Sequence, residues 1–191
     1  MQIRTANYSD LKEVKKLYRK AFPLIERKPF FMIWDKMQTG ESEILVFLLD
    51  GVFAGFAVTL IYSDLVLVDY FAVSESFRGA GIGSEALKTL FARYNGKKVM
   101  LVAETENPKA SNAKERAKRI KFYLKNSMVD TMIRVNILGS SFNLLSYPGK
   151  VSVKDYLTVN NKVMGRFFTK LTLTKICLLY TSPSPRDISG S

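Results

Sequence analysis

A glycine-rich stretch, Arg78-Gly79-Ala80-Gly81-Ile82-Gly83-Ser84, holds the residues whose types and spacing could do chemistry. It lies between an apolar run with strand character, Leu65 to Val73, and a run of helical period, Ile82 to Tyr94. Glycines without a Cβ let backbone N–H groups turn toward an anion, and the following helix adds unpaired N–H groups and the positive end of its dipole. The stretch therefore predicts a phosphate-binding loop, with Arg78 as a positive charge at its rim.

Two common phosphate-loop patterns do not fit this stretch. The dinucleotide pattern G-x-G-x-x-G needs a third glycine at the position of Ser84. The nucleotide pattern G-x-x-x-x-G-K-[ST] needs a lysine directly after its last glycine, and Ser84 occupies that position too. The pattern that remains is R-x-x-G-x-G, formed by Arg78, Gly81 and Gly83.

This pattern resembles the central motif [Q/R]-x-x-G-x-[G/A] of the GNAT superfamily of acyl-CoA-dependent N-acyltransferases. A second segment, Arg119 to Met128, resembles the family's R-I-x-F-Y-x-x-x-G-F motif, with Ser127 and Met128 where Gly-Phe is usual. The two motifs occur in the family's order, separated by one expected strand. The resemblance implies an α/β (α+β) fold, in which a central mixed, mostly antiparallel twisted sheet of about six to seven strands is flanked by about four helices.

The resemblance also implies a place for acetyl-CoA as co-substrate. In the family, the end of the strand before the loop hydrogen-bonds the pantetheine arm and the thioester through its backbone. The N–H groups of the loop hold the diphosphate. Carried over to the matching positions, the implied cofactor-binding residues are Phe71, Ala72, Val73, Arg78, Gly79, Ala80, Gly81, Ile82, Gly83, Ser84, Asn112 and Arg119.

Two catalytic residues are implied in the same way. Many family members carry, on the helix after the fifth strand, a tyrosine whose hydroxyl lies near the thiol sulfur, and Tyr123 matches it as general acid. Glu104 is the best candidate for the general base, with Asp69 and Glu106 as alternatives, because the family has no universal base. Structural alternatives stay open: a core aromatic for Tyr123, a solvated carboxylate for Glu104, and a tight connection without a ligand for Gly79 to Gly83.

Missing residue types exclude several other chemistries. The chain has no histidine, which excludes His-based acid and base catalysis, Ser-His-Asp and Cys-His systems, and most zinc sites. Cys177 is its only cysteine, so neither an intrachain disulfide nor a cysteine metal cluster is expected. Without a Cys or His nucleophile, we expect direct attack of an amine on the thioester in a ternary complex, with no metal.

The chain is basic, with 29 Lys and Arg against 17 Asp and Glu and a net charge of +12. An anionic cofactor, an acidic acceptor or plain solubility explains this charge as well as RNA does. No aromatic-rich RNA-binding motif is present, so nucleic acid is not the expected partner. Basic residues cluster on and before one predicted helix, at Lys109, Lys114, Arg116, Lys118, Arg119, Lys121 and Lys125.

Hydrophobic periodicity and turn chemistry predict the remaining elements. Asp50-Gly51 is typical of a two-residue hairpin turn, and Ser9 or Asp10 is the expected N-cap of the first helix. The predicted strands are Gln2–Arg4, Ile44–Leu49, Val52–Ile61, Leu65–Val73, Lys97–Glu104, Thr131–Leu138 and Ser141–Ser146. The predicted helices are Leu11–Ala21, Phe30–Met37, Ile82–Tyr94, Ala113–Asn126 and, with Ser152 as its cap, Val153–Phe168.

We divide the chain into three parts. Residues 1–150 form the expected GNAT N-acetyltransferase domain, and residues 151–176 a C-terminal, helical extension. Residues 177–191 are expected to be non-native or disordered, because Cys177 to Asp187 resembles, residue for residue, the conceptual translation of a transposase-type sequencing-library adaptor. A genuine Ser/Pro-rich disordered tail is the alternative.

The leading hypothesis is an N-acetyltransferase that moves an acetyl group from acetyl-CoA to a primary amine of a small molecule or protein. The alternative is a GNAT-like module that binds acyl-CoA without catalysis. A basic RNA-associated protein ranks third. The acceptor is unknown, and the residues expected to border it are Leu24 to Gly40 and the closing hairpin.

No apolar run reaches the ~20 residues of a membrane span and the N-terminus lacks a signal-peptide layout, so we expect a cytoplasmic protein that does not enter a membrane. A homodimer is left open.

Overall fold

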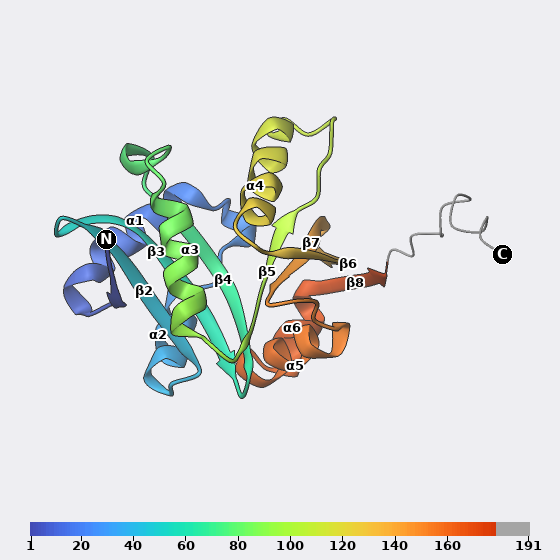
Figure 1. The fold of residues 1–191 in the computed structure, drawn as a ribbon. Coiled ribbons are helices and arrows are strands. Elements are labelled where there is room, and N and C mark those ends of the chain that lie inside the picture. The colour runs from blue at the N-terminus through green and yellow to red at the C-terminus, as the bar shows by residue number, and fades with distance from the viewer. Residues whose placement is uncertain (179–191) are drawn as a thin grey trace.

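One twisted sheet runs through the computed structural model, which describes residues 1–178 (Figure 1). Its strand order within the described residues is β1-β2-β3-β4-β5-β7-β6-β8. Only β4 and β5 are parallel neighbours, and every other neighbouring pair is antiparallel. The strands are β1 (Gln2–Thr5), β2 (Ser42–Leu49), β3 (Val52–Tyr62), β4 (Leu65–Val73), β5 (Lys98–Glu104), β6 (Val129–Ile137), β7 (Ser140–Tyr147) and β8 (Leu173–Leu178).

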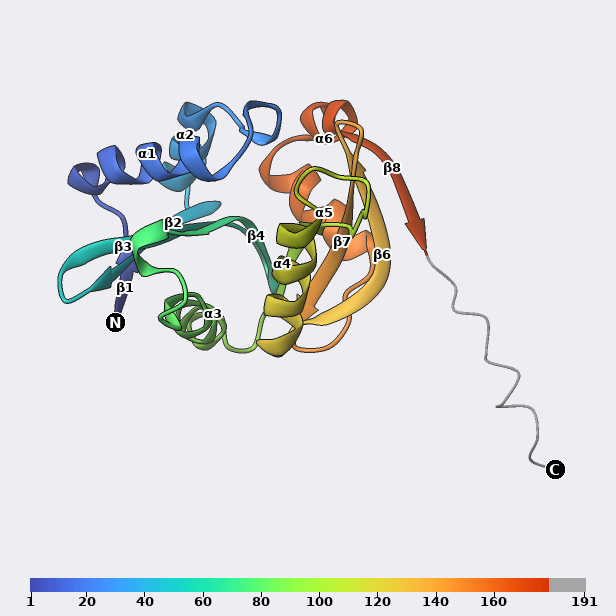
Figure 2. The same cartoon turned by 90° about the horizontal axis from the view of Figure 1, so that it is seen from above.

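The predicted mixed, mostly antiparallel sheet is confirmed, with β8 as a strand beyond the expected number. Helices cover both faces of the sheet (Figure 2). The helices α3 and α4 pack on one face, while α1 and α2 cover one half of the other face and α5 and α6 its other half. The helices are α1 (Leu11–Ala21), α2 (Phe30–Gln38), α3 (Ile82–Arg93), α4 (Ala113–Lys125), α5 (Val153–Val163) and α6 (Arg166–Thr172).

The N-terminal elements follow the hydrophobic pattern closely. Leu11, Val14, Leu17 and Tyr18 of α1 are buried against the sheet, as their helical spacing predicts. Asp10 occupies the N-cap position of α1, as predicted, but its side chain makes no capping hydrogen bond to this helix. A 3-10 turn precedes the helix, and the side chain of Asn7 caps that turn instead.

The Asp50-Gly51 turn between β2 and β3 is confirmed. Asp50 has a φ of 50° and Gly51 a φ of 79°, so both residues adopt the positive φ that a tight hairpin turn of this type requires. The turn places β2 and β3 side by side in the N-terminal half of the sheet, where Phe47 and Phe56 are fully buried.

The C-terminal part is more elaborate than a single helix. The predicted helix Val153–Phe168 is divided, because Gly165 has a φ of 90° and an extended ψ of 145° that interrupt it between α5 and α6. Ser152 caps α5 as predicted, in a reciprocal capping box with Asp155. Tyr156, Val159 and Val163 of α5 then bury themselves against the sheet, so residues 151–176 share the core of the domain.

The last described strand reaches into the segment that resembles an adaptor. Cys177 pairs with Arg134 and Leu178 with Ile133, both on β6. The remainder of that segment, residues 179–191, lies outside the described residues. Within residues 1–178, none of the helices is both long enough and apolar enough to cross a bilayer.

Candidate active site

The strands β4 and β5 pair over a short distance and then separate. Their parallel ladder joins Leu65–Val68 to Lys98–Leu101. β4 continues to Val73 and β5 to Glu104 beyond the end of this ladder. The far half of β4 keeps β3 on one edge, so its other edge presents backbone N–H and C=O groups toward the gap. We refer to this place as the strand divergence.

A β-bulge at Asp69 lies where the strands separate. The pairing of β4 with β3 passes from Val68 to Tyr70 and skips Asp69. Because side chains alternate between the faces of a strand, one extra residue reverses the alternation. Val68 therefore packs with α3 and α4, whereas Tyr70 packs with α1 on the opposite face. Phe71 returns to the α4 side, with its ring centroid 6.5 Å from that of Tyr123.

The glycine-rich stretch forms the connection from β4 to α3 that the sequence predicts. Gly79 and Gly81 have φ values of 84° and 80°, and a Cβ would have no neighbour within 4 Å at either. Their positive φ, not crowding, requires glycine there. Gly81 is the N-cap of α3, and no side chain among the described residues caps this helix. The first N–H groups of α3 therefore suit an anion.

The third glycine and the arginine of the motif have additional contacts. A Cβ on Gly83 would lie 3.1 Å from Cζ of Phe122, so Gly83 lets α3 and α4 approach closely. Close packing thus explains why Gly83 is a glycine, but it does not explain Gly79 or Gly81. Arg78 is exposed, and its Nε donates a hydrogen bond to the carbonyl of Val73 at 3.3 Å.

Tyr123 of α4 lies beside the strand divergence. The residue is 7% exposed and packs with Phe71 and Phe122, so it is a core aromatic in part. Burial raises the pKa of its hydroxyl to about 12, and the positive charge of Arg119 opposes that rise. Within residues 1–178, no hydrogen-bond partner of this hydroxyl is found. It is thus protonated at neutral pH and able to donate.

Glu104 is the last residue of β5, the strand that borders the divergence on the side opposite β4. It is 7% exposed, so the alternative of a solvated carboxylate is wrong. Arg116 and Arg119 of α4 form ion pairs with its two oxygens at 2.9 and 3.0 Å. Asn112 lies 3.4 Å from Glu104 Oε2 as a hydrogen-bond donor and accepts a 2.7 Å hydrogen bond from Nε of Arg116. The structure therefore brings three predicted site residues together: Glu104, Asn112 and Arg119.

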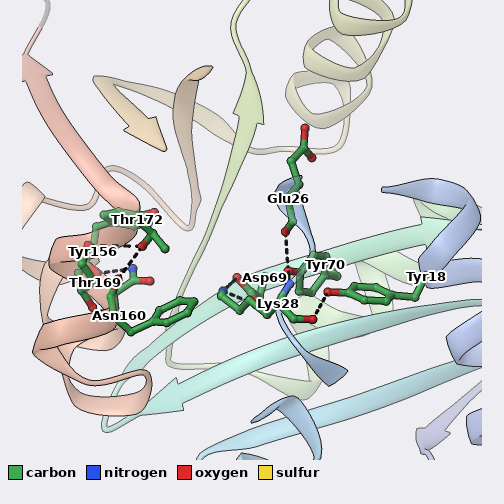
Figure 3. A network of polar contacts seen from close by, with 10 residues as sticks. Tyr18, Glu26, Lys28, Asp69, Tyr70, Tyr156, Asn160, Thr169 and Thr172 are labelled. Atoms are coloured by element: carbon green, nitrogen blue, oxygen red, sulfur yellow. Dashed lines mark hydrogen bonds and ion pairs between the residues drawn. The ribbon is translucent and has the colours of Figure 1, made fainter. Parts of the chain in front are cut away.

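The segment between α1 and α2 is fastened to β4. The Tyr70 hydroxyl donates to the carbonyl of Glu26 at 2.8 Å and accepts from the backbone N–H of Lys28 at 3.0 Å. The Tyr18 hydroxyl donates to the carbonyl of Lys28 at 3.0 Å. Lys28 Nζ forms an ion pair with the bulge residue Asp69 (Figure 3). These contacts fix the chain on either side of Glu26.

Two alternatives for the base are placed less favourably. The carboxylate of Asp69 contacts Lys28 Nζ with both oxygens, at 2.5 and 2.6 Å, so it holds the segment instead of facing the divergence unpaired. Glu106 follows β5 and is exposed.

Sequence reasoning missed Glu26, whose carboxylate extends from the anchored segment toward α4 (Figure 3). Its signal was an acidic residue directly after the apolar pair Leu24-Ile25, in the segment expected to border the acceptor.

Metal-based chemistry has no visible basis in the described residues. No group of three or more His, Cys, Asp or Glu side chains is arranged to hold a metal ion there. What the divergence combines is an edge of unpaired strand backbone, the N-terminus of a helix, a protonated phenol and several carboxylates. These groups suit the binding of an extended anionic molecule and proton transfer beside it.

Solved structures share this architecture. A protein from Bacteroides thetaiotaomicron assigned to the GNAT family aligns with a TM-score of 0.69 at 19% identity, covering 92% of this chain and 100% of the other. Ard1 from Thermoplasma volcanium aligns with a TM-score of 0.57 at 25% identity, covering 76% and 95%. Arabidopsis thaliana Naa50, in complex with a bisubstrate analogue of CoA and a peptide, aligns with a TM-score of 0.58 at 20% identity, covering 78% and 98%.

The family assignment comes from the sequence itself. No curated protein matches the chain. A family model described as the acetyltransferase (GNAT) family matches residues 11–125, which is more than half of the chain and includes the glycine-rich stretch, Glu104 and Tyr123. The chain belongs to the acetyltransferase (GNAT) family.

Proposed function

We propose that the chain transfers an acetyl group from acetyl-CoA to a primary amine by direct attack in a ternary complex. The observation that carries the proposal is the strand divergence, in which the glycine-rich connection leads from the free β4 edge to the uncapped N-terminus of α3. An unpaired strand edge can hydrogen-bond an extended amide-containing arm, and the helix N-terminus can bind its diphosphate. Membership of the GNAT family and the CoA-based ligand of the Naa50 structure support the same reading.

The residues around the divergence supply the remaining steps. Backbone groups of Phe71 to Val73 orient the thioester, and the N–H groups of Arg78 to Ser84 hold the phosphates. Tyr123 donates a proton to the thiolate that leaves, since its raised pKa keeps it protonated at neutral pH. The base is a carboxylate at the mouth of the divergence, where Glu104, predicted for this role, and Glu26 both lie. The acceptor is a small molecule or a protein.

The alternative, a module that binds acyl-CoA without catalysis, rested on Ser127 and Met128 in place of Gly-Phe. Ser127 has a φ of 68°, which is the conformation that glycine adopts most easily. Met128 is 2% exposed and fills the core where the motif has phenylalanine. Both departures are thus accommodated within the fold, and neither removes a group from the divergence. This favours the catalytic reading.

Calorimetric titration of the full chain with acetyl-CoA tests the cofactor site. Gly81→Val is expected to abolish binding, because the substitution strains the loop that holds the phosphates. Gly96→Val is the matched control, since Gly96 has the same φ of 80° and open space but lies beyond the other end of α3. It should bind like the wild type. Absence of binding by the wild type, or equal binding by Gly81→Val, would contradict the proposal.

A further inference from the structure

The carboxylates around the strand divergence differ in what already contacts them. Glu104 has its two oxygens in ion pairs with Arg116 and Arg119. Asp69 has both oxygens against Lys28 Nζ. For the Glu26 carboxylate, no ion pair or hydrogen bond is found within residues 1–178, although the side chain is only partly exposed. Of these three groups, Glu26 alone makes no charge-neutralising contact with the described residues, so no neighbouring cation competes with a proton for its oxygens.

The position of Glu26 is fixed by its backbone. Tyr70 binds the Glu26 carbonyl and the N–H of Lys28, and the ion pair of Lys28 with Asp69 ties the same segment to the bulge. Because the bulge lies where β4 and β5 separate, this anchoring sets Glu26 above the mouth of the divergence. Figure 3 shows its side chain extending away from Tyr70 toward the helix α4.

Charged groups of β5 and α4 also act on the same carboxylate. Burial raises the pKa of Glu26, and the negative charge of Glu104 raises it further, while Arg119 and Arg116 act in the opposite direction. The charges of Glu104, Arg119 and Arg116 thus all change the pKa of Glu26. A carboxyl whose pKa lies above its usual value is better matched to accepting a proton near neutral pH.

We propose that Glu26, and not Glu104, is the catalytic residue that accepts the proton of the acceptor ammonium. This inference rests on the proposed function. One N–H proton of the ammonium passes to a Glu26 oxygen, and the neutral amine attacks the thioester carbonyl so that a C–N bond forms. The C–S bond then breaks, Tyr123 gives its proton to the thiolate, and the phenolate regains one from the amide nitrogen. Glu26 later releases its proton to water, while Glu104 keeps the arginines in place.

Two nucleophiles of different basicity separate the role of a base from a structural role. Butylamine is protonated at neutral pH and needs a base, whereas hydroxylamine is largely unprotonated there and does not. For Glu26→Gln we expect the rate of acetyl transfer to butylamine to fall about 10²–10⁴-fold, the typical contribution of a general base. Transfer to hydroxylamine should stay within a few-fold of the wild type. The butylamine deficit should shrink as the pH rises.

Controls identify which step fails. Glu26→Gln is nearly isosteric and removes no ion pair, so acetyl-CoA binding by calorimetry and the thermal midpoint should not fall. Glu13→Gln on α1 is the matched control away from the divergence and should leave both reactions unchanged. Equal loss of both reactions in Glu26→Gln, or wild-type transfer to butylamine, would overturn the assignment of Glu26. Failure of the wild type to acetylate either nucleophile would instead overturn the proposed function, and the inference with it.

Discussion

Ser127→Gly is expected to make the chain more stable. The residue follows the C-terminus of α4 with a φ of 68°. Its N–H donates to the carbonyl of Leu124 at 3.3 Å, and the N–H of Met128 donates to the carbonyl of Tyr123 at 3.2 Å. These two bonds form a Schellman motif, in which the left-handed position is usually glycine. Ser127 is exposed, so its side chain has little packing to lose.

The size of the gain follows from two opposing terms. A left-handed conformation costs an L-residue roughly 1–2 kcal/mol, which glycine does not pay. Glycine loses about 0.5–1 kcal/mol more conformational entropy on folding. The net stabilisation is therefore about 0.5–1 kcal/mol, equivalent to an increase in thermal midpoint of about 1–4 °C for a domain of this size.

Thermal and urea unfolding of the variant measure this gain. Ser76→Gly provides the matched control, because Ser76 is also exposed but lies in a 3-10 turn without positive φ, where glycine should be neutral or slightly destabilising. Ser127→Ala, which keeps the left-handed strain, should not stabilise the chain. An unchanged or lower midpoint for Ser127→Gly, or the same gain in Ser76→Gly, would refute the reasoning.

Three further perturbations test other parts of the fold. Gly55→Ala would place a Cβ 2.4 Å from the Ala72 carbonyl oxygen, so we expect about 1–3 kcal/mol of destabilisation by thermal unfolding and weaker acetyl-CoA binding in calorimetry, as the end of β4 must move. Ser152→Ala removes the cap of α5 and should cost about 1 kcal/mol in urea unfolding. The hydrogen bond from Arg4 lowers the pKa of Asp10, and a lowered carboxyl pKa stabilises the fold above the unfolded-state pKa and ceases to do so as pH falls through the folded-state pKa. Unfolding of the wild type and Asp10→Asn should accordingly differ at neutral pH and converge in acid.

Local signals were sufficient to predict the glycine-rich connection from β4 to α3 and most of the sheet. The glycine residue type by itself indicates the positive φ of Gly79 and Gly81. In the same way, the residue pair Asp50-Gly51 predicts the hairpin turn. The apolar run of β4 and the helical period of α3 then place the loop between them. Such features depend on residues that are neighbours in sequence, and for that reason the residue types predict them.

Features that depend on contacts distant in sequence were not predicted. The bulge at Asp69 exists only in the pairing of β4 with β3, and residue type does not mark it. Gly165 was read as part of a helix, although its positive φ divides α5 from α6. The ion pairs of Glu104 join β5 to two arginines of the next helix, α4. Sequence reasoning could name Glu104 and Arg119 separately, but not that they neutralise each other.

The bulge explains how elements on opposite faces of the sheet can supply the acid and the base of the proposed reaction to the same divergence. If Asp69 took a regular paired position in the ladder, Tyr70 would lie on the same face as Val68 and point toward α4. With it, Tyr70 points toward α1 and anchors the segment that carries Glu26, while Phe71 packs beside Tyr123. Asp69 itself binds Lys28 of the same segment. The bulge at Asp69 thus interrupts the regular register of β4 and places Phe71 beside Tyr123. Through its ion pair with Lys28, Asp69 also holds the segment that carries Glu26.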